Sequence, residues 1–279
     1  MTPTIRLIGL PTDRNSSFLR GSAEAPGFIR AQLFSEMGNL ATEAGLEMGE
    51  HFVIEDAGDL PLAEAADDDI LIEAAVKAAI DANRRPLCFG GDHSVTYPIV
   101  KAVAAAYGPI NILHFDAHPD LYDELDGNRR SHASPFARIM EAGLATRLVQ
   151  VGIRTLNRHQ REQAARFGVE IVEMRHFSTD TVPLLSGPLY ISLDLDGIDP
   201  AFAPGVSHHE PGGLSVRDVL NVLARQNALV VGADVVELNP SRDVNGVTAV
   251  VAAKFAKELM GLMARPTLQF LLPNTLQPA

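Results

Sequence analysis

The stretch Ile-Leu-His-Phe-Asp-Ala-His-Pro-Asp, residues 112–120, is the most informative part of this chain. It begins with an apolar run and ends in an Asp-x-His-x-Asp pattern, which is typical of a buried strand with polar side chains at its carboxyl end. Residues at i, i+2 and i+4 of a strand point to one side of a sheet. We therefore expect Asp116, His118 and Asp120 to converge.

Two further apolar runs end in the same kinds of residue. Tyr-Ile-Ser-Leu-Asp-Leu-Asp (190–196) ends in Asp194 and Asp196, and Leu-Cys-Phe-Gly-Gly-Asp-His (87–93) ends in His93. Carboxylates in such places repel one another and resist desolvation unless a cation neutralises them. Six ligands exceed the needs of one tetrahedral zinc ion and suit two bridged ions of higher coordination number. The pattern predicts a binuclear metallohydrolase.

The oxygen-rich ligand set with two imidazoles favours Mn²⁺, with Co²⁺, Ni²⁺ or Fe²⁺ as substitutes. Two such ions that share one water would lower its pKa enough to supply hydroxide near neutral pH. Each motif alone also fits a structural histidine or solvated carboxylates, and only their combination after three apolar runs favours metal. No nucleophile elbow brackets a serine, and Gly90-Gly91 lacks the spacing of a phosphate-binding loop.

Short apolar runs alternate with helical patterns along the chain. Strands are predicted at residues 4–10, 87–90, 110–115, 148–152, 169–172, 189–195 and 229–236. Helices are predicted at residues 64–83, 95–106, 134–141, 158–167, 216–226 and 249–263. Ser215 is the expected N-cap of the helix that starts at residue 216. The strands are continuously apolar, as in sheets covered on both faces, so we expect an α/β protein with three α/β/α layers around a largely parallel sheet.

One domain is expected, spanning residues 1–279, because no linker, charge block, repeat or low-complexity stretch divides the chain. In open α/β sheets ligands bind outside the carboxyl ends of the strands. The six candidate metal ligands all follow strands in that way, so the metal site is expected at the carboxyl edge of the sheet.

The chain carries a net charge of −12 over 279 residues, which argues against nucleic acid as a partner and would attract a small cationic substrate. No apolar run reaches membrane-spanning length, and residues 1–11 show no secretory signal. The single cysteine, Cys88, rules out an intrachain disulfide. We therefore expect a cytoplasmic protein that binds neither nucleic acid nor a membrane.

Three motifs resemble the ureohydrolase family of arginases and agmatinases: Gly-Gly-Asp-His-Ser (90–94), Asp-Ala-His-Pro-Asp (116–120) and Ser-Leu-Asp-Leu-Asp-Gly-Ile-Asp-Pro-Ala-Phe-Ala-Pro-Gly (192–205). Four further segments are similar to plant-type arginases, at residues 15–19, 131–134, 205–214 and 235–240. The resemblance covers essentially the whole chain. It implies the arginase-like fold and a homo-oligomer, either a trimer or a hexamer.

The resemblance also implies roles at the metal centre. Each subunit would hold two manganese ions, one bound by His93 and Asp120 and the other by His118 and Asp196. Asp116 and Asp194 would bridge the two ions. Asp120 would also orient the bridging hydroxide. Glu237 would pair with the substrate guanidinium, and His132 would carry a proton to the departing amine.

Contacts to the rest of the substrate are less specified. The loop 123–130 corresponds to the carboxylate-binding loop of animal-type arginases, where Asn128 would donate a hydrogen bond and Arg129 or Arg130 would pair with the carboxylate. The stretch Gly-Ile-Arg-Thr-Leu-Asn (152–157) departs from animal-type arginases, which carry acidic residues there for the α-amino group.

The remaining histidines have no assigned chemistry. His208 and His209 lie in a loop bounded by Gly and Pro that could wall the pocket. The other histidines are expected to be structural or to lie on the surface: His51, His114, His159 and His176.

Three functions remain open at this point. The first is arginase, which hydrolyses L-arginine to L-ornithine and urea by attack of the metal-bridging hydroxide. The second is agmatinase, which forms putrescine and urea from agmatine, or another guanidino-acid ureohydrolase. The third is a non-catalytic metal-binding scaffold or sensor, which the presence of all six candidate ligands together with Glu237 and His132 disfavours.

Overall fold

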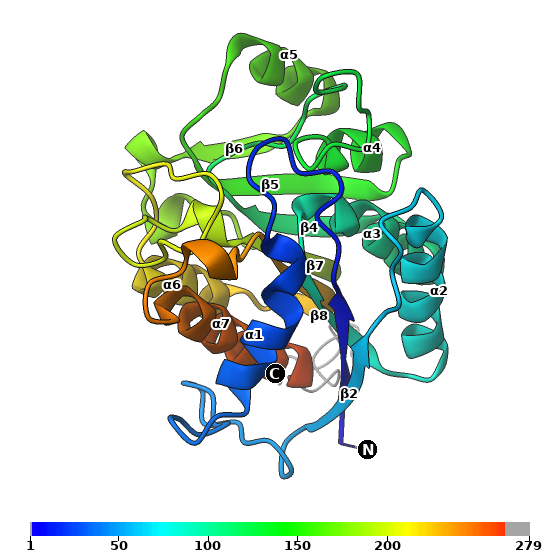
Figure 1. Cartoon of the computed structure of the whole chain (residues 1–279), viewed down its shortest axis with the longest axis vertical. Coiled ribbons are helices and arrows are strands. Elements are labelled where there is room, and N and C mark those ends of the chain that lie inside the picture. The colour runs from blue at the N-terminus through cyan, green and yellow to red at the C-terminus, as the bar shows by residue number, and fades with distance from the viewer. Residues whose placement is uncertain (1, 266–279) are drawn as a thin grey trace, which may run out of the picture.

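The computed structural model describes residues 2–265, so Met1 and residues 266–279 of the expected single domain lie outside the described part. Eight strands form one sheet in which all neighbours are parallel, in the order β2-β1-β3-β8-β7-β4-β5-β6 (Figure 1). The strands are β1 (Thr4–Leu10), β2 (Val53–Asp59), β3 (Arg85–Gly90), β4 (Ile110–Phe115), β5 (Ala145–Ile153), β6 (Glu170–Glu173), β7 (Pro188–Asp194) and β8 (Leu229–Val236). The predicted parallel sheet is confirmed.

Helices cover both faces of this sheet. They are α1 (Ala25–Leu33), α2 (Asp68–Asp81), α3 (Thr96–Tyr107), α4 (Pro135–Glu141), α5 (Arg158–Phe167), α6 (Val216–Arg225) and α7 (Val247–Ala264). One apolar cluster joins the sheet to α1, α6 and α7, and a second joins it to the helices α2 to α5. The predicted three layers are therefore confirmed.

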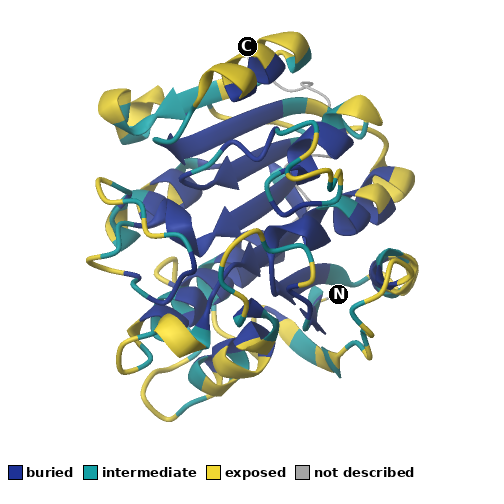
Figure 2. Ribbon diagram, turned by 45° about the horizontal axis from the view of Figure 1, so that its top comes forward, coloured by how far each residue is buried: buried dark blue, intermediate teal, exposed yellow. Residues whose placement is uncertain are grey.

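Alternation along each strand divides its side chains between the two clusters. In β1, Ile5 and Leu7 belong to the cluster under α1 and α7, whereas Ile8 and Leu10 belong to the other. This is the period of two that a pleated strand imposes, with both faces apolar because both are covered. Figure 2 accordingly shows the central strands buried along their length and the outer faces of the helices exposed.

Most elements lie where the sequence predicts them, and two were missed. The strands β1, β4 and β8 and the helix α5 have the predicted bounds, and Ser215 caps α6 in a capping box with Asp218. The edge strand β2 was missed because its sequence, Val-Ile-Glu-Asp-Ala-Gly-Asp, is acidic and only partly buried. The helix α1 was missed because it opens with Ala-Pro-Gly, although a proline fits the first turn of a helix, where N–H groups lack partners.

The order of the strands brings the candidate site residues together. The strands β3, β8, β7 and β4 are consecutive neighbours at the centre of the sheet. His93 follows the end of β3 and Glu237 the end of β8, while Asp194 is the last residue of β7 and Asp116 follows β4. Parallel strands end at the same edge of a sheet, so residues far apart in sequence meet there.

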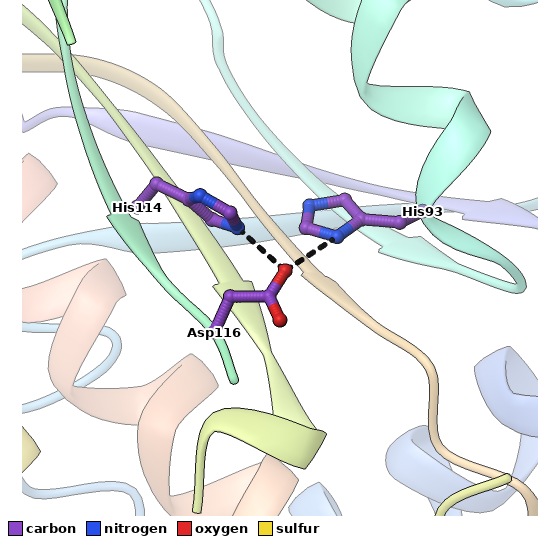
Figure 3. A group of neighbouring side chains, drawn as sticks. All are labelled: His93, His114 and Asp116. Carbon is purple, nitrogen blue, oxygen red and sulfur yellow. Dashed lines mark hydrogen bonds and ion pairs between the residues drawn. The ribbon is translucent and has the colours of Figure 1, made fainter. Parts of the chain in front are cut away.

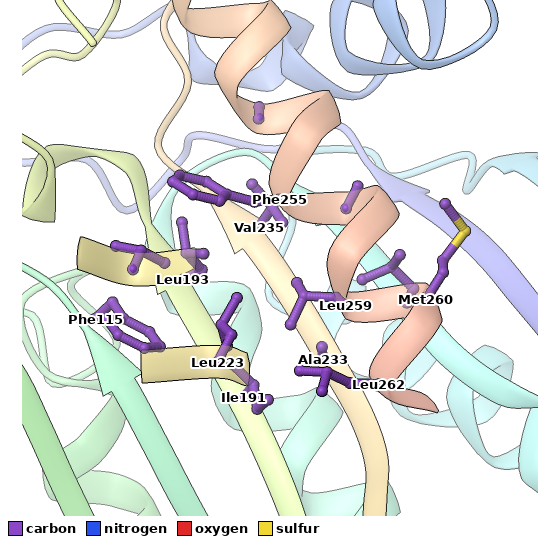
Figure 4. Packing of buried hydrophobic residues seen from close by; sticks show 14 of the residues in the cluster. Phe115, Ile191, Leu193, Leu223, Ala233, Val235, Phe255, Leu259, Met260 and Leu262 are labelled. Carbon is purple, nitrogen blue, oxygen red and sulfur yellow. The ribbon is translucent and has the colours of Figure 1, made fainter. Parts of the chain in front are cut away.

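The long helix α7 supplies much of the core on its side of the sheet. Its Phe255 and Leu259 face Leu193 of β7 and Val235 of β8 (Figure 4), and all four side chains are fully buried. Removal of a buried aromatic ring leaves a cavity that the surrounding close-packed side chains fill only in part.

We expect Phe255→Ala to lower the free energy of unfolding by about 3 to 5 kcal/mol, because the lost burial and the residual cavity both count against the folded state. Val247→Ala on the same helix is the control, because Val247 is 43% exposed; it should change stability by less than about 0.5 kcal/mol. Urea unfolding of the three proteins measures both effects. Equal destabilisation by the two substitutions would contradict the assignment of Phe255 to the core.

Candidate metal centre and catalytic cavity

His93 lies at the start of a short 3₁₀ helix that follows β3 directly, and its ring faces three carboxylates. Its Nδ1 atom is 3.3 Å from Oδ2 of Asp116, 3.1 Å from Oδ2 of Asp120 and 3.0 Å from Oδ2 of Asp194. Figure 3 shows the ring turned toward Asp116. The same Nδ1 is buried and lacks a hydrogen-bond partner with acceptable geometry.

His118 faces a second group of carboxylates. Its Nδ1 lies 3.0 Å from Oδ2 of Asp196 and 3.3 Å from Oδ1 of Asp116. Asp116 therefore turns one carboxylate oxygen to His93 and the other to His118. The structure thus brings all six predicted ligands into one cluster, in which Asp116 is common to both halves.

Turns, rather than continued strands, produce this convergence. The strand β4 ends at Phe115 and β7 ends at Asp194, so the prediction that the ligands alternate along strands is wrong in this detail. Asp120 adopts a left-handed backbone conformation with φ of 51°. Asp196 lies in a 3₁₀ turn, and its backbone N–H donates to Oδ1 of Asp194 at 2.8 Å. Irregular backbone brings the carboxylates closer together than the pleat of a strand would.

Burial makes these charges costly in the absence of a cation. Burial raises the pKa of Asp194 well above its ordinary value, and the charges of Asp196 and Asp116 add to this effect. The pKa of Asp196 is raised to about 6, again mainly by burial. Burial alone would lower the pKa values of His93 and His118, but the facing carboxylates raise both well above the ordinary value.

The donor set fits divalent metal ions. In the described structure, protons on the buried His93 and the partly buried His118 have to balance four carboxylates, and the Nδ1 atom of His93 has no hydrogen bond of acceptable geometry. Divalent cations would take the place of these protons and accept both imidazole nitrogens and carboxylate oxygens as ligands. Two overlapping groups have ligand atoms close enough to hold an ion: His93, His114 and Asp116, and Asp116, His118 and Asp196.

A hydrogen-bond chain behind His93 fixes its orientation. The Nε2 atom of His93 lies 2.9 Å from Oγ of Ser192, which donates to Oδ1 of Asp234 at 2.7 Å. Tyr190 and Thr96 donate their hydroxyls to the other oxygen of Asp234, each at 2.7 Å. Since the Ser192 hydroxyl gives its proton to Asp234, it accepts one from Nε2, which leaves Nδ1 free to face the carboxylates.

His114, expected from the sequence to be structural or on the surface, is fully buried and lies against the carboxylate cluster. Its Nε2 lies 2.8 Å from Oδ2 of Asp116, and its Nδ1 lies 3.0 Å from the amide nitrogen of Gln150. The centroid of its ring lies 4.0 Å from that of Phe136, with the two planes tilted by 32°. Burial lowers the pKa of His114, although Asp116 opposes this effect. Its position two residues before Asp116 on a buried strand was the available signal, because both side chains point to one side.

Glu237 and His132 form a pair beside this cluster of aspartates and histidines. The Oε1 atom of Glu237 lies 2.8 Å from Nδ1 of His132 and accepts the N–H of His93 at 2.9 Å. Burial alone would lower the pKa of His132, but the charge of Glu237 raises it to about 9. Burial would raise the pKa of Glu237, and the charge of His132 lowers it, so the carboxylate stays ionised.

A cavity of about 240 Å³ opens onto both the cluster and this pair. Its walls include four of the predicted metal ligands, which are His118, Asp120, Asp194 and Asp196, and the predicted catalytic pair of His132 and Glu237. The other wall residues are Ser17, Tyr122, Leu125, Ala133, Thr155, Gln160, His208 and Glu210. His208 therefore walls the pocket as the sequence suggested, while Glu210 was not anticipated.

The predicted contacts to a substrate carboxylate are absent from these walls. Arg130 pairs with Asp69 of α2 through two hydrogen bonds of 2.7 and 2.8 Å and lies over the ring of Tyr97. The Asn128 amide donates to the side chain of Asn15 at 3.1 Å. Since neither residue lines the cavity, the structure does not bring Asn128 or Arg130 to the place that the sequence analysis gave them.

The family model described as the arginase family matches residues 3–261. Arginase 1, mitochondrial, of Arabidopsis thaliana is 53% identical over 93% of this chain and 81% of its own length. Among solved structures, the arginase from Medicago truncatula superposes with a TM-score of 0.88 at 46% identity, covering 94% of this chain and 88% of the other. An agmatinase of Bacillus cereus is 34% identical over 91% of this chain and 90% of its own length.

We expect Asp116→Asn to bind far less manganese than the wild-type protein, because an amide lacks the charge with which Asp116 would serve both ions. Metal analysis after dialysis measures the loss. Manganese should also raise the melting temperature of the wild type and leave that of the variant nearly unchanged. Asp81→Asn, on the exposed end of α2, is the control. A wild-type manganese content in Asp116→Asn would contradict the bridging position.

Proposed function

The chain belongs to the arginase family, and we propose on this basis that it hydrolyses L-arginine to L-ornithine and urea. The observation that carries the proposal is the single cavity in which Glu237 and His132 adjoin the aspartate and histidine cluster. A carboxylate that can bind a guanidinium there lies next to ligands for two metal ions. The names of the similar arginases from Arabidopsis thaliana and Medicago truncatula support arginine as the substrate.

We propose two Mn²⁺ ions in this centre, with Co²⁺, Ni²⁺ or Fe²⁺ as substitutes. The proposed ligands are His93 with Asp120 for one ion, His118 with Asp196 for the other, and Asp116 and Asp194 for both. The contacts of His93 with Asp120 and of His118 with Asp196 support the first two pairs, and Asp116 faces both histidines. When bound, the ions would make a water acidic enough to act as the nucleophile near neutral pH. Asp120 lines the cavity and would orient that water by accepting a hydrogen bond.

Glu237 is proposed to bind the guanidinium. Its side chain is only 4% exposed, and its pKa is lowered by His132, so a negative charge faces the cavity. The backbone of Glu237 is left-handed, with φ of 65°, which an L-residue adopts only at a cost of about 1 kcal/mol or more. A planar guanidinium pairs with a carboxylate through two parallel hydrogen bonds, so this geometry would hold the reacting carbon beside the metal cluster.

His132 is proposed to carry a proton to the departing amine. Its Nδ1 donates to Glu237 at 2.8 Å, and its Nε2 lies 3.1 Å from the backbone nitrogen and 2.8 Å from the hydroxyl oxygen of Ser17. Because its pKa is raised to about 9, His132 would hold a proton near neutral pH and would pass it from Nε2 to the amine nitrogen as the carbon–nitrogen bond breaks. Glu237, which lies 2.8 Å from Nδ1, would stabilise the imidazolium before that transfer.

Agmatine hydrolysis is the second candidate, and one feature of the cavity favours it. Within the described residues, no lysine or arginine lines the cavity, so a substrate carboxylate would find neither of the side chains that usually pair with it there. Agmatine lacks that carboxylate and presents the same guanidinium. The similarity to the agmatinase of Bacillus cereus adds to this alternative.

Urea release by the manganese-loaded protein from L-arginine and from agmatine tests the proposal directly. We expect kcat/KM for L-arginine to exceed that for agmatine by about tenfold or more, the size of effect that a few differential contacts produce. The reverse preference would replace arginase with agmatinase. Absence of urea from both substrates, with metal bound, would contradict hydrolysis of either compound.

A second prediction concerns Glu237→Gln, which keeps the shape of the side chain and removes its charge. We expect manganese binding to persist, and kcat/KM for L-arginine to fall by about tenfold to hundredfold, because a charge-assisted hydrogen bond is lost. Glu162→Gln on exposed α5 is the control and should retain wild-type kinetics. A wild-type KM in Glu237→Gln would remove Glu237 from the substrate site.

We also propose a homo-oligomer, a trimer or a hexamer, in the cytoplasm. Exposed apolar side chains of Phe28 on α1 and of Phe34 and Met37 just after it support a contact between subunits. The single cysteine suits a reducing compartment, whereas the Arabidopsis thaliana relative is named mitochondrial. Among the described residues no helix is long and apolar enough to cross a membrane.

A further inference from the structure

The loop between Asp196 and α6 is tied firmly to the metal centre by Arg154. The guanidinium of Arg154 donates to the carbonyl oxygens of Asp196 at 2.7 Å, Gly197 at 3.1 Å and Glu210 at 2.8 Å. Gly213 passes so close that a Cβ atom there would lie 2.7 Å from Nη2 of Arg154. The backbone of Glu210 is therefore fixed relative to the turn that carries Asp196.

A second anchor holds the far end of this loop. The Oδ2 atom of Asp199 accepts the N–H groups of Gly212 at 2.7 Å and Gly213 at 2.9 Å. Nε2 of His209 lies 2.6 Å from the carbonyl oxygen of Pro204. With its main chain held on both sides, Glu210 projects a carboxylate from a rigid wall instead of a free loop.

The carboxylate of Glu210 stands at the cavity, half-exposed and uncommitted. Its side chain is 40% exposed, and the nearest cationic group described is Nε2 of His118, at 3.9 Å from Oε1. This distance is too long for a hydrogen bond. Asp120, Asp194 and Asp196 are turned to the metal-binding histidines and Glu237 to His132, so Glu210 is the remaining acid on these walls.

We propose that Glu210 binds the ammonium group at the end of the substrate opposite to the guanidinium, and so selects guanidino compounds that carry a second positive charge. The inference rests on the proposed function, because it assumes that Glu237 holds the guanidinium. The remaining wall residues that have no role yet, among them Tyr122, Thr155 and Gln160, are uncharged. Glu210 is thus the one described group on the walls able to offset a charge at the substrate tail.

The chemistry of the tail makes this selection measurable. L-Arginine and agmatine both carry an ammonium group on the fourth carbon from the guanidino nitrogen. N-Butylguanidine ends there in a methyl group, and 4-guanidinobutyrate has a carboxylate carbon at that position. A carboxylate on the enzyme attracts the first two, is indifferent to the third and repels the fourth.

The experiment compares urea release from these four guanidines by manganese-loaded wild type, Glu210→Gln and the control Glu162→Gln. We expect Glu210→Gln to raise KM for L-arginine and agmatine by about fivefold, the size of a half-exposed ion pair, with kcat changed by less than about twofold. KM for N-butylguanidine should stay unchanged, and KM for 4-guanidinobutyrate should fall. Glu162→Gln should follow the wild type with all four.

Each other outcome assigns Glu210 differently. Unchanged KM values for L-arginine and agmatine would place the binding site of the ammonium group elsewhere. An equal rise in KM for all four guanidines would mean that Glu210 does not distinguish the charge at the end of the substrate. Loss of manganese from Glu210→Gln, measured by metal analysis, would make the residue a support for His118. If the wild type releases no urea from any of the four compounds, the proposed function itself fails, and this inference falls with it.

Discussion

The repulsion among buried carboxylates at one edge of the sheet is the constraint on which the rest of the structure depends. Asp116, Asp194 and Asp196 are almost fully withdrawn from water, and carboxylates so placed are stable only with facing cations. His93 and His118 supply positive charge in the described structure, and metal ions would supply more. The four central strands serve this arrangement, since their ends deliver the acids and histidines to one place.

The fold was largely predictable because its central strands are covered on both faces. A strand such as β4 or β8 must be apolar along its length. Such an apolar run can be recognised in the sequence without knowledge of which strands lie beside it. The strand β2 gives no such signal, because an edge strand keeps one side open and here carries acids that pair with arginines from elsewhere, such as Arg30 with Asp56. Its place is set by pairing with β1, which local sequence does not reveal.

The positions of site residues that directly follow strands could be predicted from the sequence. The positions of loop residues could not, because they depend on contacts with distant parts of the chain. His93 and Asp116 follow apolar runs directly, so topology alone brings them together. Arg130 was assigned to the substrate because the loop 123–130 corresponds to the carboxylate-binding loop of animal-type arginases, but its guanidinium pairs with Asp69, sixty-one residues away. Glu210, in contrast, was given no role from the sequence. It lines the cavity because Arg154 binds its backbone carbonyl and holds the loop in place.

The turn after β3 joins the metal side of the cavity to the substrate side. There the ring of His93 faces the carboxylate cluster, while its backbone N–H donates to Glu237 at 2.9 Å. The turn is held against the neighbouring chain, because a Cβ atom at Gly91 would collide with the carbonyl oxygen of Thr12, and the N–H of Asp92 donates to that oxygen at 3.0 Å. A shift of this turn would therefore displace His93 and the carboxylate of Glu237 together. Under the proposed roles, the placement of the guanidinium relative to the metal ions would then depend on one short segment of backbone, and hydrolysis needs its reacting groups held in a defined geometry.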